Sequence, residues 1–445
     1  MAHARFTTRS ETQAWGEAWT STKTLTQVYR TQILDVGKAN LGYNARDPEN
    51  RVRQEQRPAE GISVRVELRV STNRRKASLV LRDGAVFEGY LFGAAQPAAG
   101  EVVFNTGMVG YPEAITDPSY YGQILTLTYP LIGNYGVPSF EADDYGIPRS
   151  FESDRIQVRG LITANYYDDY HHWNATRSLG DWLESENVPG LFGVDTRALT
   201  LHLRERGAVL GKIVVPGQEE PAWYDPSAEN VVGLVSRPEP VTYGDGDPHI
   251  AVLDCGVKNN ILRCLLKRGA RVTVLPWNFD IEAAEYDGLL VSNGPGDPEQ
   301  CRAVADRLAR LLTEKRPIFG ICLGCQILGI AAGGRTFKLP FGHRGQNQPV
   351  YESSTGRWAI TSQNHGYAVD PNSLPAEWET WFVNGNDQTL EGLQMADGPH
   401  RAVQFHPEAV CGPVDTSYLF DVFLDEVRRS KGEAGSRRQG VAHGE

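Results

Sequence analysis

Several features are scarce in this chain of 445 residues, and each scarcity excludes a class of protein. No apolar run approaches the ~20 residues that cross a bilayer, and no apolar signal-peptide core follows the start. Lys and Arg number 44 against 55 Asp and Glu, which gives a formal net charge of −11. Because nucleic-acid surfaces are built from clustered basic residues, the composition predicts a soluble globular protein with neither a nucleic-acid nor a membrane partner.

Cysteine is missing from the first half of the chain, and all six cysteines lie beyond residue 250. A secreted protein held together by disulfides spreads its cysteines, and a chain of this length does not need such bridges. We therefore expect a reducing compartment, the cytoplasm.

Residues 1–75 form a polar segment with little apolar periodicity, which predicts an extension that is disordered or packs only weakly. Its Arg and Thr content suits a transit peptide, and the location would then be mitochondrial. The acidic residues Glu11, Glu17 and Asp35 favour an uncleaved tail instead, because transit peptides avoid acidic side chains.

Two folded regions follow this extension. Residues 76–225 carry the pattern of an α+β domain, and residues 226–248 are rich in Pro, Gly and Asp, as linkers are. Residues 249–430 alternate strands with helices, which predicts an α/β fold with a mostly parallel central sheet flanked by helices. The charged, Gly-rich residues 431–445 suit a free end or a linker. The expected strands cover 77–81, 85–90, 101–104, 123–128, 249–254, 271–275, 286–292 and 317–320, and the expected helices cover 178–186, 257–266 and 303–313.

The sharpest local signal is the sequence Phe-Gly-Ile-Cys-Leu-Gly at Phe319–Gly324. A Gly-x-nucleophile-x-Gly pattern between a strand and an apolar helix is typical of a nucleophile elbow. A cysteine there gains thiolate character from the helix N-terminus and from a neighbouring imidazole. A buried structural cysteine is the alternative. The two glycines at the required positions favour Cys322 as a nucleophile.

Cys322 and Cys325 also form a Cys-x-x-Cys pair, which occurs in redox proteins and in zinc sites. A structural zinc site needs a second ligand pair, and no further Cys-x-x-Cys or close histidine pair follows. We therefore expect no metal in this chain.

A general base for the nucleophile is available in Phe405–Glu408, with the sequence Phe-His-Pro-Glu. Residues two apart in an extended segment share a face, so His406 and Glu408 can point into one cleft. Glu408 can then orient the imidazole, which is the third role in a catalytic triad. The loop Ser292–Pro298 contains two glycines around a proline, and its backbone N–H groups could complete an oxyanion hole with the N–H of Leu323.

Together these segments, with Gln-Asn-His-Gly-Tyr at Gln363–Tyr367, resemble a class I (triad) glutamine amidotransferase. The first folded region resembles the amino-terminal domain of the carbamoyl-phosphate synthase small subunit. The resemblance runs from about Lys76 to Ser430. It fits separate small subunits and the glutaminase region of multifunctional pyrimidine-pathway proteins. The segments that carry it are Gly100–Gly107, Gly110–Glu113, Thr116–Tyr120, Leu131–Gly136, Gly193–Arg197 and Phe341–Gly345.

The resemblance implies a role for each motif. Cys322 attacks the side-chain amide of L-glutamine and leaves a glutamyl thioester, while His406, oriented by Glu408, acts as general base and acid. Ammonia then passes through a tunnel to a carbamoyl-phosphate synthase large (synthetase) subunit or domain, which uses bicarbonate, ATP and Mg²⁺. No cofactor is implied in this chain itself. The residues implied to bind glutamine are Ser119, Gly294, Gly296, Leu323, Gln326, Asn364, Gly366 and Tyr367.

One departure from the family pattern is Cys325, because the family usually has histidine there. Since the histidine of the triad is His406, we expect a working glutaminase. The alternative hypothesis is a catalytically silent subunit that regulates or scaffolds the synthetase. Other triad glutaminases, such as those of anthranilate or GMP synthesis, lack the first folded region. The product could serve pyrimidine or arginine synthesis, and the chain could be a subunit or part of a longer polypeptide.

Overall fold

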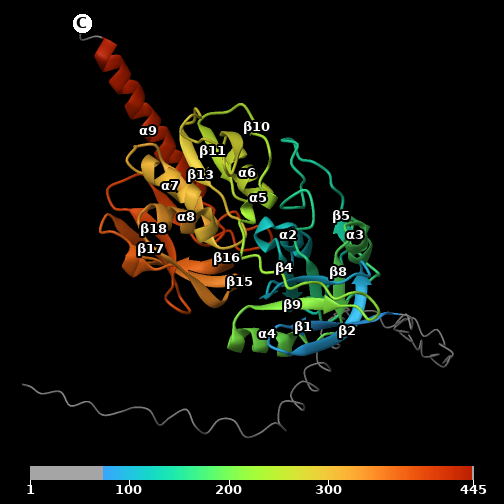
Figure 1. Ribbon diagram of the computed structural model, residues 1–445. Helices are drawn as coiled ribbons and strands as arrows, with labels where there is room; N and C mark the ends of the chain where they lie inside the picture. The colour runs from blue at the N-terminus through green and yellow to red at the C-terminus, as the bar shows by residue number, and fades with distance from the viewer. Residues whose placement is uncertain (1–73, 443–445) are drawn as a thin grey trace, which may run out of the picture. The chain divides into compact units, whose positions relative to one another are not determined.

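The computed structural model describes residues 74–442, with side chains described as far as Gly432 (Figure 1). The described residues belong to one compact unit, Ser71–Glu445. Our expectations for the first 73 residues lie outside the described range. Among the described helices, none combines the length and the apolar character that crossing a membrane requires.

The first region is a closed barrel of seven strands in the order β1-β2-β8-β6-β4-β3-β9, coloured blue to green in Figure 1. The sequence predicted four of these strands, at 77–81, 85–90, 101–104 and 123–128, but neither the other three nor the closure. The strands are β1 (Lys76–Leu81), β2 (Val86–Gly93), β3 (Ala98–Asn105), β4 (Gln123–Leu127), β6 (Gly160–Thr163), β8 (Pro189–Phe192) and β9 (Val209–Val214). A separate pair is formed by β5 (Val137–Pro138) and β7 (Ala175–Arg177), and the helices are α2 (Tyr111–Thr116), η2 (Pro118–Tyr120), α3 (Leu179–Ser185) and α4 (Thr196–Arg206).

Alternation of side chains explains how the barrel has two cores. Successive residues of a strand point to opposite faces, so one set fills the interior and the other packs against helices. On β3, Val102 and Phe104 join the inner cluster, whereas Val103 joins the outer one. The outer cluster includes Trp182 of α3, which is fully buried.

The second region is a sheet of ten strands in the order β10-β12-β11-β13-β14-β19-β18-β17-β15-β16. The pairs from β12 to β19 are parallel, as predicted, and the strands beyond β19 extend the sheet in antiparallel fashion. The strands are β10 (Val241–Tyr243), β11 (His249–Asp254), β12 (Arg271–Pro276), β13 (Gly288–Val291), β14 (Ile318–Ile321), β15 (Thr336–Glu352), β16 (Arg357–Val369), β17 (Trp378–Asn384), β18 (Leu390–Met395) and β19 (Arg401–Val403).

Helices cover both faces of the parallel part of this sheet. On β11, Ile250 and Val252 share a cluster with α6 (Asn259–Leu266) and α9 (Leu419–Ala442). The intervening Ala251 shares a cluster with α7 (Arg302–Leu311) and α8 (Leu323–Ala331) on the other face. Both faces are apolar, as expected for a parallel sheet between two helix layers. The short helices η3 (Pro298–Cys301) and η4 (Pro371–Ser373) complete the region.

Two segments differ from the sequence-based expectations. Residues 226–248, expected to be a linker, contain α5 (Val232–Val235) and the edge strand β10, because Val232 is buried and β10 pairs with β12. Residues 431–445, expected to be a free end or linker, continue α9 as far as Ala442. At the start of this stretch, Lys431 Nζ lies 2.9 Å from Asp287 Oδ2, which joins the helix to the sheet region.

The barrel core generates a first prediction. Trp182 is fully buried, packs against Phe151 with ring centroids 5.2 Å apart, and donates a hydrogen bond from Nε1 to Glu186 Oε1 at 2.6 Å. We expect Trp182→Ala to lower the free energy of unfolding by about 3–5 kcal/mol, because the cavity cannot collapse fully. Denaturant unfolding measures the change. Trp173, which is 89% exposed, is the matched control, and an equal loss in Trp173→Ala would contradict the assignment.

Candidate active site

The predicted catalytic residues lie at the carboxyl ends of adjacent parallel strands. Cys322 directly follows β14, and His406 follows β19, which pairs with β14. The Ser292–Pro298 loop follows β13 on the other side of β14. Ligands bind at this edge of open α/β sheets, so the topology gathers residues that are distant in the sequence.

Cys322 occupies a strained backbone conformation between β14 and α8. Its φ of 55° and ψ of −105° are rare for a residue with a side chain. Such strain costs on the order of 1–3 kcal/mol and is typical of functional turns. The Cys322 N–H donates to Val403 O at 2.8 Å, and Sγ lies 3.7 Å from Asn364 O. The turn therefore holds the thiol at the N-terminus of α8, as expected for a nucleophile elbow.

The two glycines of the motif are required by close backbone contacts. A Cβ on Gly320 would lie 2.6 Å from Gly324 O, and a Cβ on Gly324 would lie 2.0 Å from Val291 O. No side chain fits at either distance. The Gly-x-Cys-x-Gly pattern thus reflects the packing of α8 against β13 and β14.

His406 and Glu408 meet as their spacing predicted. Nδ1 of His406 lies 2.7 Å from Glu408 Oε1, and both residues are buried. The other ring nitrogen, Nε2, is buried without a hydrogen-bond partner among the described residues. Nε2 is therefore available to exchange a proton with a reacting group.

Lys258, which the sequence analysis did not single out, supplies the charge beside this pair. Its Nζ lies 2.8 Å from Glu408 Oε1 and 4.0 Å from Asp117 Oδ2 of the barrel region. Burial alone would raise the pKa of Glu408. Attraction to Lys258 and His406 outweighs the effect of burial and lowers this pKa to about 2. Burial and the charge of Lys258 lower the pKa of His406. Glu408 and Cys322 have the opposite and larger effect, so that the pKa of His406 is raised to about 10. The site therefore favours an imidazolium beside the thiol.

The barrel region contributes polar groups to the same site. Asp117 accepts hydrogen bonds from the Ser119 N–H at 2.9 Å and from Asn364 Nδ2 at 3.2 Å. Ser119 Oγ in turn accepts a bond from Asn293 Nδ2 at 2.9 Å. Both regions of the chain therefore build one site.

The residues implied to bind glutamine gather, with one exception, around a single pocket that also exposes Cys322. Leu323 is buried and does not line the pocket. Gln326 is held by its Nε2, which donates to Tyr367 O at 2.9 Å and to Gln404 Oε1 at 3.1 Å. The pocket also contains three charged residues that the sequence analysis missed, Glu101, Lys338 and Arg344. The predicted residues that line it are Ser119, Gly294, Gly296, Gln326, Asn364, Gly366 and Tyr367.

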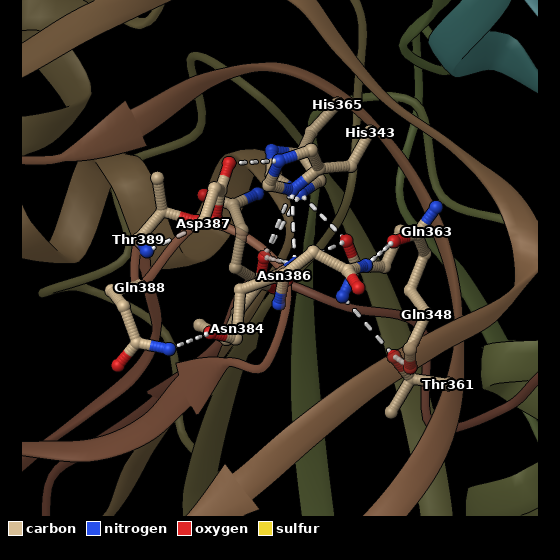
Figure 2. Close-up of polar contacts among 12 residues, drawn as sticks. His343, Gln348, Thr361, Gln363, His365, Asn384, Asn386, Asp387, Gln388 and Thr389 are labelled. Carbon is tan, nitrogen blue, oxygen red and sulfur yellow. Dashed lines mark hydrogen bonds and ion pairs between the residues drawn. The ribbon is translucent and has the colours of Figure 1, made fainter. Parts of the chain in front are cut away.

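The opposite face of β15 and β16 carries a buried polar network (Figure 2). His343 Nδ1 lies 3.0 Å from Glu391 Oε1, and His343 Nε2 lies 2.8 Å from Asp387 Oδ2. His365, Glu391 and His343 are close enough to hold a metal ion, with ligand atoms within 4.8 Å. The Asn384 Oδ1 atom accepts from the Asn386 N–H at 2.8 Å, so Asn384 Nδ2 donates to Glu391 Oε1 at 3.0 Å. A donor at this position favours a hydrogen-bonded network over a metal centre.

The Cys-x-x-Cys pair is divided between the two cores. Cys322 belongs to the cluster that contains α6 and α9, whereas Cys325 is fully buried in the cluster that contains α7. Burial raises the pKa of the Cys325 thiol, and the neighbouring Glu391 raises it further. Cys325 is therefore poorly suited to thiol–disulfide exchange with Cys322, and its burial favours a structural role.

Comparison with known families agrees with this geometry. The family profile of class I glutamine amidotransferases matches residues 251–426. The profile of the carbamoyl-phosphate synthase small chain, CPSase domain, matches residues 79–213. The fold and the site thus define a glutamine amidotransferase of class I.

The relatives define the family more narrowly. The chain is 50% identical over 365 residues to the carbamoyl phosphate synthase arginine-specific small chain of Aspergillus oryzae, covering 80% of this chain and 81% of the relative. It is 50% identical to the carbamoyl-phosphate synthase [ammonia], mitochondrial, of Aquarana catesbeiana, and the match covers 82% of this chain and 24% of the relative. It is 46% identical to the multifunctional protein URA2 of Saccharomyces cerevisiae, and the match covers 81% of this chain and 18% of the relative. The chain belongs to the carbamoyl-phosphate synthase small-chain family and is the glutaminase component of a carbamoyl-phosphate synthase, which implies a synthetase subunit or domain as its partner.

The elbow geometry generates a second prediction. We expect Gly324→Ala to lower the free energy of unfolding by at least about 2 kcal/mol, because the added methyl group overpacks a backbone contact. Glutaminase activity should fall with it, since the thiol is displaced. Gly432→Ala is the control, because its added methyl group meets nothing within 4 Å. Unchanged unfolding of Gly324→Ala would show that the turn is not tightly packed.

The buried carboxyl of Glu152 generates a prediction on pH. Burial raises the pKa of Glu152 from 4.5 to about 7, although Lys258, the Asn260 N–H and Arg263 oppose the shift. The folded state thus binds the proton more tightly than the unfolded state, so stability is fully present below pH ~4.5 and is lost as pH rises towards ~7. We expect Glu152→Gln to remove this loss, which is on the order of 3 kcal/mol.

Denaturant unfolding at pH 5 and pH 8 measures the Glu152 effect. The stability of Glu152→Gln relative to the wild type should rise between the two values. The exposed Glu184 is the control, because Glu184→Gln should show the same difference at both. A pH-independent difference for Glu152→Gln would contradict the raised pKa.

Proposed function

We propose that Cys322, His406 and Glu408 form the catalytic triad of this glutaminase. The observation that carries the proposal is the strained Cys322 at the N-terminus of α8, with the buried His406–Glu408 pair in the segment that follows the adjoining strand β19. The Cys322 thiolate attacks the amide carbon of L-glutamine, and a proton from His406 Nε2 goes to the departing nitrogen as the C–N bond breaks. The products of this step are ammonia and a glutamyl thioester.

The second half of the reaction reverses these proton movements. His406, now neutral, takes a proton from water, and the hydroxide attacks the thioester carbon. The C–S bond breaks, and glutamate leaves while the thiolate and imidazolium form again. Glu408 stays ionised throughout, because Lys258 keeps the pKa of this carboxyl low. Its role is to hold the imidazole and to stabilise the imidazolium.

Stabilisation of the oxyanion is proposed for the N–H of Leu323 and for the loop that contains Gly294. A Cβ on Gly294 would lie 2.8 Å from Leu323 Cδ2, so the loop packs directly beside the start of α8. One well-placed N–H donor is worth about 3–4 kcal/mol in the transition state. The rigid elbow therefore serves the oxyanion as well as the thiol.

We propose that ammonia leaves through a second cavity on the far side of Asn364. Asn364 lines both this cavity and the glutamine pocket, whereas Cys322 lines the pocket alone and His406 lines the cavity alone. The proton donor for the leaving nitrogen thus borders the second cavity. This arrangement supports delivery of ammonia to the synthetase partner, which makes carbamoyl phosphate from it with bicarbonate, ATP and Mg²⁺.

The names of the relatives and the state of the cysteines bear on the setting of the reaction. The names of the Aspergillus relatives favour arginine synthesis as the use of the carbamoyl phosphate, with pyrimidine synthesis as the alternative. All six cysteines are unpaired, which suits the cytoplasm or, with a transit peptide, the mitochondrial matrix.

Substitution of the nucleophile tests the proposed function. In the complex with the synthetase, we expect Cys322→Ser to lower glutamine-dependent carbamoyl-phosphate synthesis by at least ~10³-fold, because a serine hydroxyl is not activated by this imidazole as a thiol is. Synthesis from added ammonia should persist. Cys264→Ser is the control and should keep both activities. Glutamate release by Cys322→Ser would overturn the triad, and a wild-type complex without glutaminase activity would favour the silent-subunit hypothesis.

A further inference from the structure

Trp173 is the most exposed large apolar side chain in the described part of the chain, at 89%. It lies in residues 166–174, between β6 and β7, a segment with three tyrosines, two histidines and this tryptophan among nine residues. We call this segment the aromatic loop. Its Tyr167 is exposed as well, and so is Leu131 in the segment beside it. Because exposed apolar patches mark interaction sites and aromatic side chains are enriched in interfaces, the aromatic loop has the composition of a docking surface.

Backbone hydrogen bonds hold the aromatic loop on the neighbouring segment of the barrel region. The Tyr167 N–H donates to Ile132 O at 3.0 Å, and the His171 N–H donates to Asn134 O at 3.0 Å. A loop that is fixed before its partner arrives loses little conformational entropy on binding. Trp173 is therefore presented to solvent from a preorganised backbone.

Ring contacts lead from Trp173 to the start of α2. The centroids of Trp173 and His172 lie 5.5 Å apart, and those of His172 and Tyr135 lie 6.2 Å apart. Tyr135 Oη accepts hydrogen bonds from the N–H of Gly110 at 2.9 Å and from that of Tyr111 at 3.0 Å. N–H groups at the start of a helix have no partner within the helix, and Gly110 has no side chain to cap α2. The hydroxyl of Tyr135 thus fixes the start of α2 from the side of the aromatic loop.

The start of α2 also belongs to the wall of the second cavity, through which ammonia is proposed to leave. Gly110 lines this cavity together with His406. Met108 and Val109, directly before Gly110, are exposed apolar residues. Apolar surface is therefore present both at the cavity wall and at Trp173. Ammonia that reaches bulk water is protonated and lost, so the protein that receives it must cover the surface beside this wall.

We propose that the aromatic loop is a docking surface for the synthetase partner and that Trp173 is its anchor. The inference rests on the proposed exit of ammonia through the second cavity, because that exit decides which protein covers this face. The matching surface of the synthetase is an apolar pocket with a hydrogen-bond acceptor, since a buried indole N–H needs one. Docking at Trp173 also covers His172, so the contact with Tyr135 and the cavity wall lies directly behind the interface.

Titration calorimetry of the chain with the synthetase tests the proposal. We expect Trp173→Ala to raise the Kd by at least ~30-fold, which is the loss typical of an anchoring aromatic residue. The glutaminase activity of the separate chain should match that of the wild type, because Trp173 lines neither the glutamine pocket nor the second cavity. Glutamine-dependent carbamoyl-phosphate synthesis should fall at low protein concentration and return at concentrations above the new Kd.

Two variants serve as comparisons for Trp173→Ala. Trp173→Phe keeps an apolar ring, so it should lose less affinity than Trp173→Ala. Trp223→Ala is the matched control, because Trp223 is also an exposed tryptophan of the barrel region but has a partner within the chain, Lys212, whose Nζ lies 4.3 Å from the ring centroid. This control should leave the Kd for the synthetase unchanged.

Two results would overturn the docking surface. One is a Kd of Trp173→Ala equal to that of the wild type. The other is a wild-type homodimer, measured by analytical ultracentrifugation, that Trp173→Ala dissociates while binding to the synthetase stays intact, because the loop would then dock a second copy of this chain. Since the Kd is measured without glutamine, a wild type that binds the synthetase but does not hydrolyse glutamine would contradict the proposed function instead.

Discussion

The buried ammonium of Lys258 is the interaction on which the site depends. It lies between a carboxylate of the sheet region, Glu408, and one of the barrel region, Asp117. Without this cation two buried carboxylates would face each other uncompensated, and the usual response is protonation of one of them. A protonated Glu408 could no longer stabilise the imidazolium of His406. The same charge therefore joins the two regions and sets the proton balance of the chemistry.

Alternation along β16 gives one strand two tasks. Asn364 and His365 both line the pocket, but the imidazole of His365 also reaches the network behind the strand, with Nε2 3.6 Å from Glu391 Oε1. His365 Nδ1 lies 2.9 Å from Tyr367 O, so the buried network also fixes the backbone that lines the pocket. The polar groups of the network around Glu391 take no part in the reaction, but they fix the position of β16.

The parts of this site that are local in sequence could be predicted, and the parts that depend on distant contacts could not. The elbow around Cys322 needs glycines at fixed offsets, and the His406–Glu408 contact follows from a spacing of two residues. Lys258 showed no local pattern, because its partner Asp117 comes from the other region of the chain. Arg344 was missed for a related reason, because it meets Asn364 and the pocket through strand pairing and not through a local sequence pattern. Several strands were predictable from apolar patterns, but β6, β8 and β9 were missed, and closure of the barrel depends on pairings between strands such as β1 and β9.

The hydrogen bond from Asn293 to Ser119 has a consequence for how such a chain can evolve. A domain that contains its whole active site can be copied, moved and fused to new neighbours, and it keeps its activity. Here the boundary between the barrel and the sheet runs through the reaction centre itself. The two regions must therefore be inherited together, and gene fusion can add partners at the ends of this pair but cannot separate its members without dividing the site.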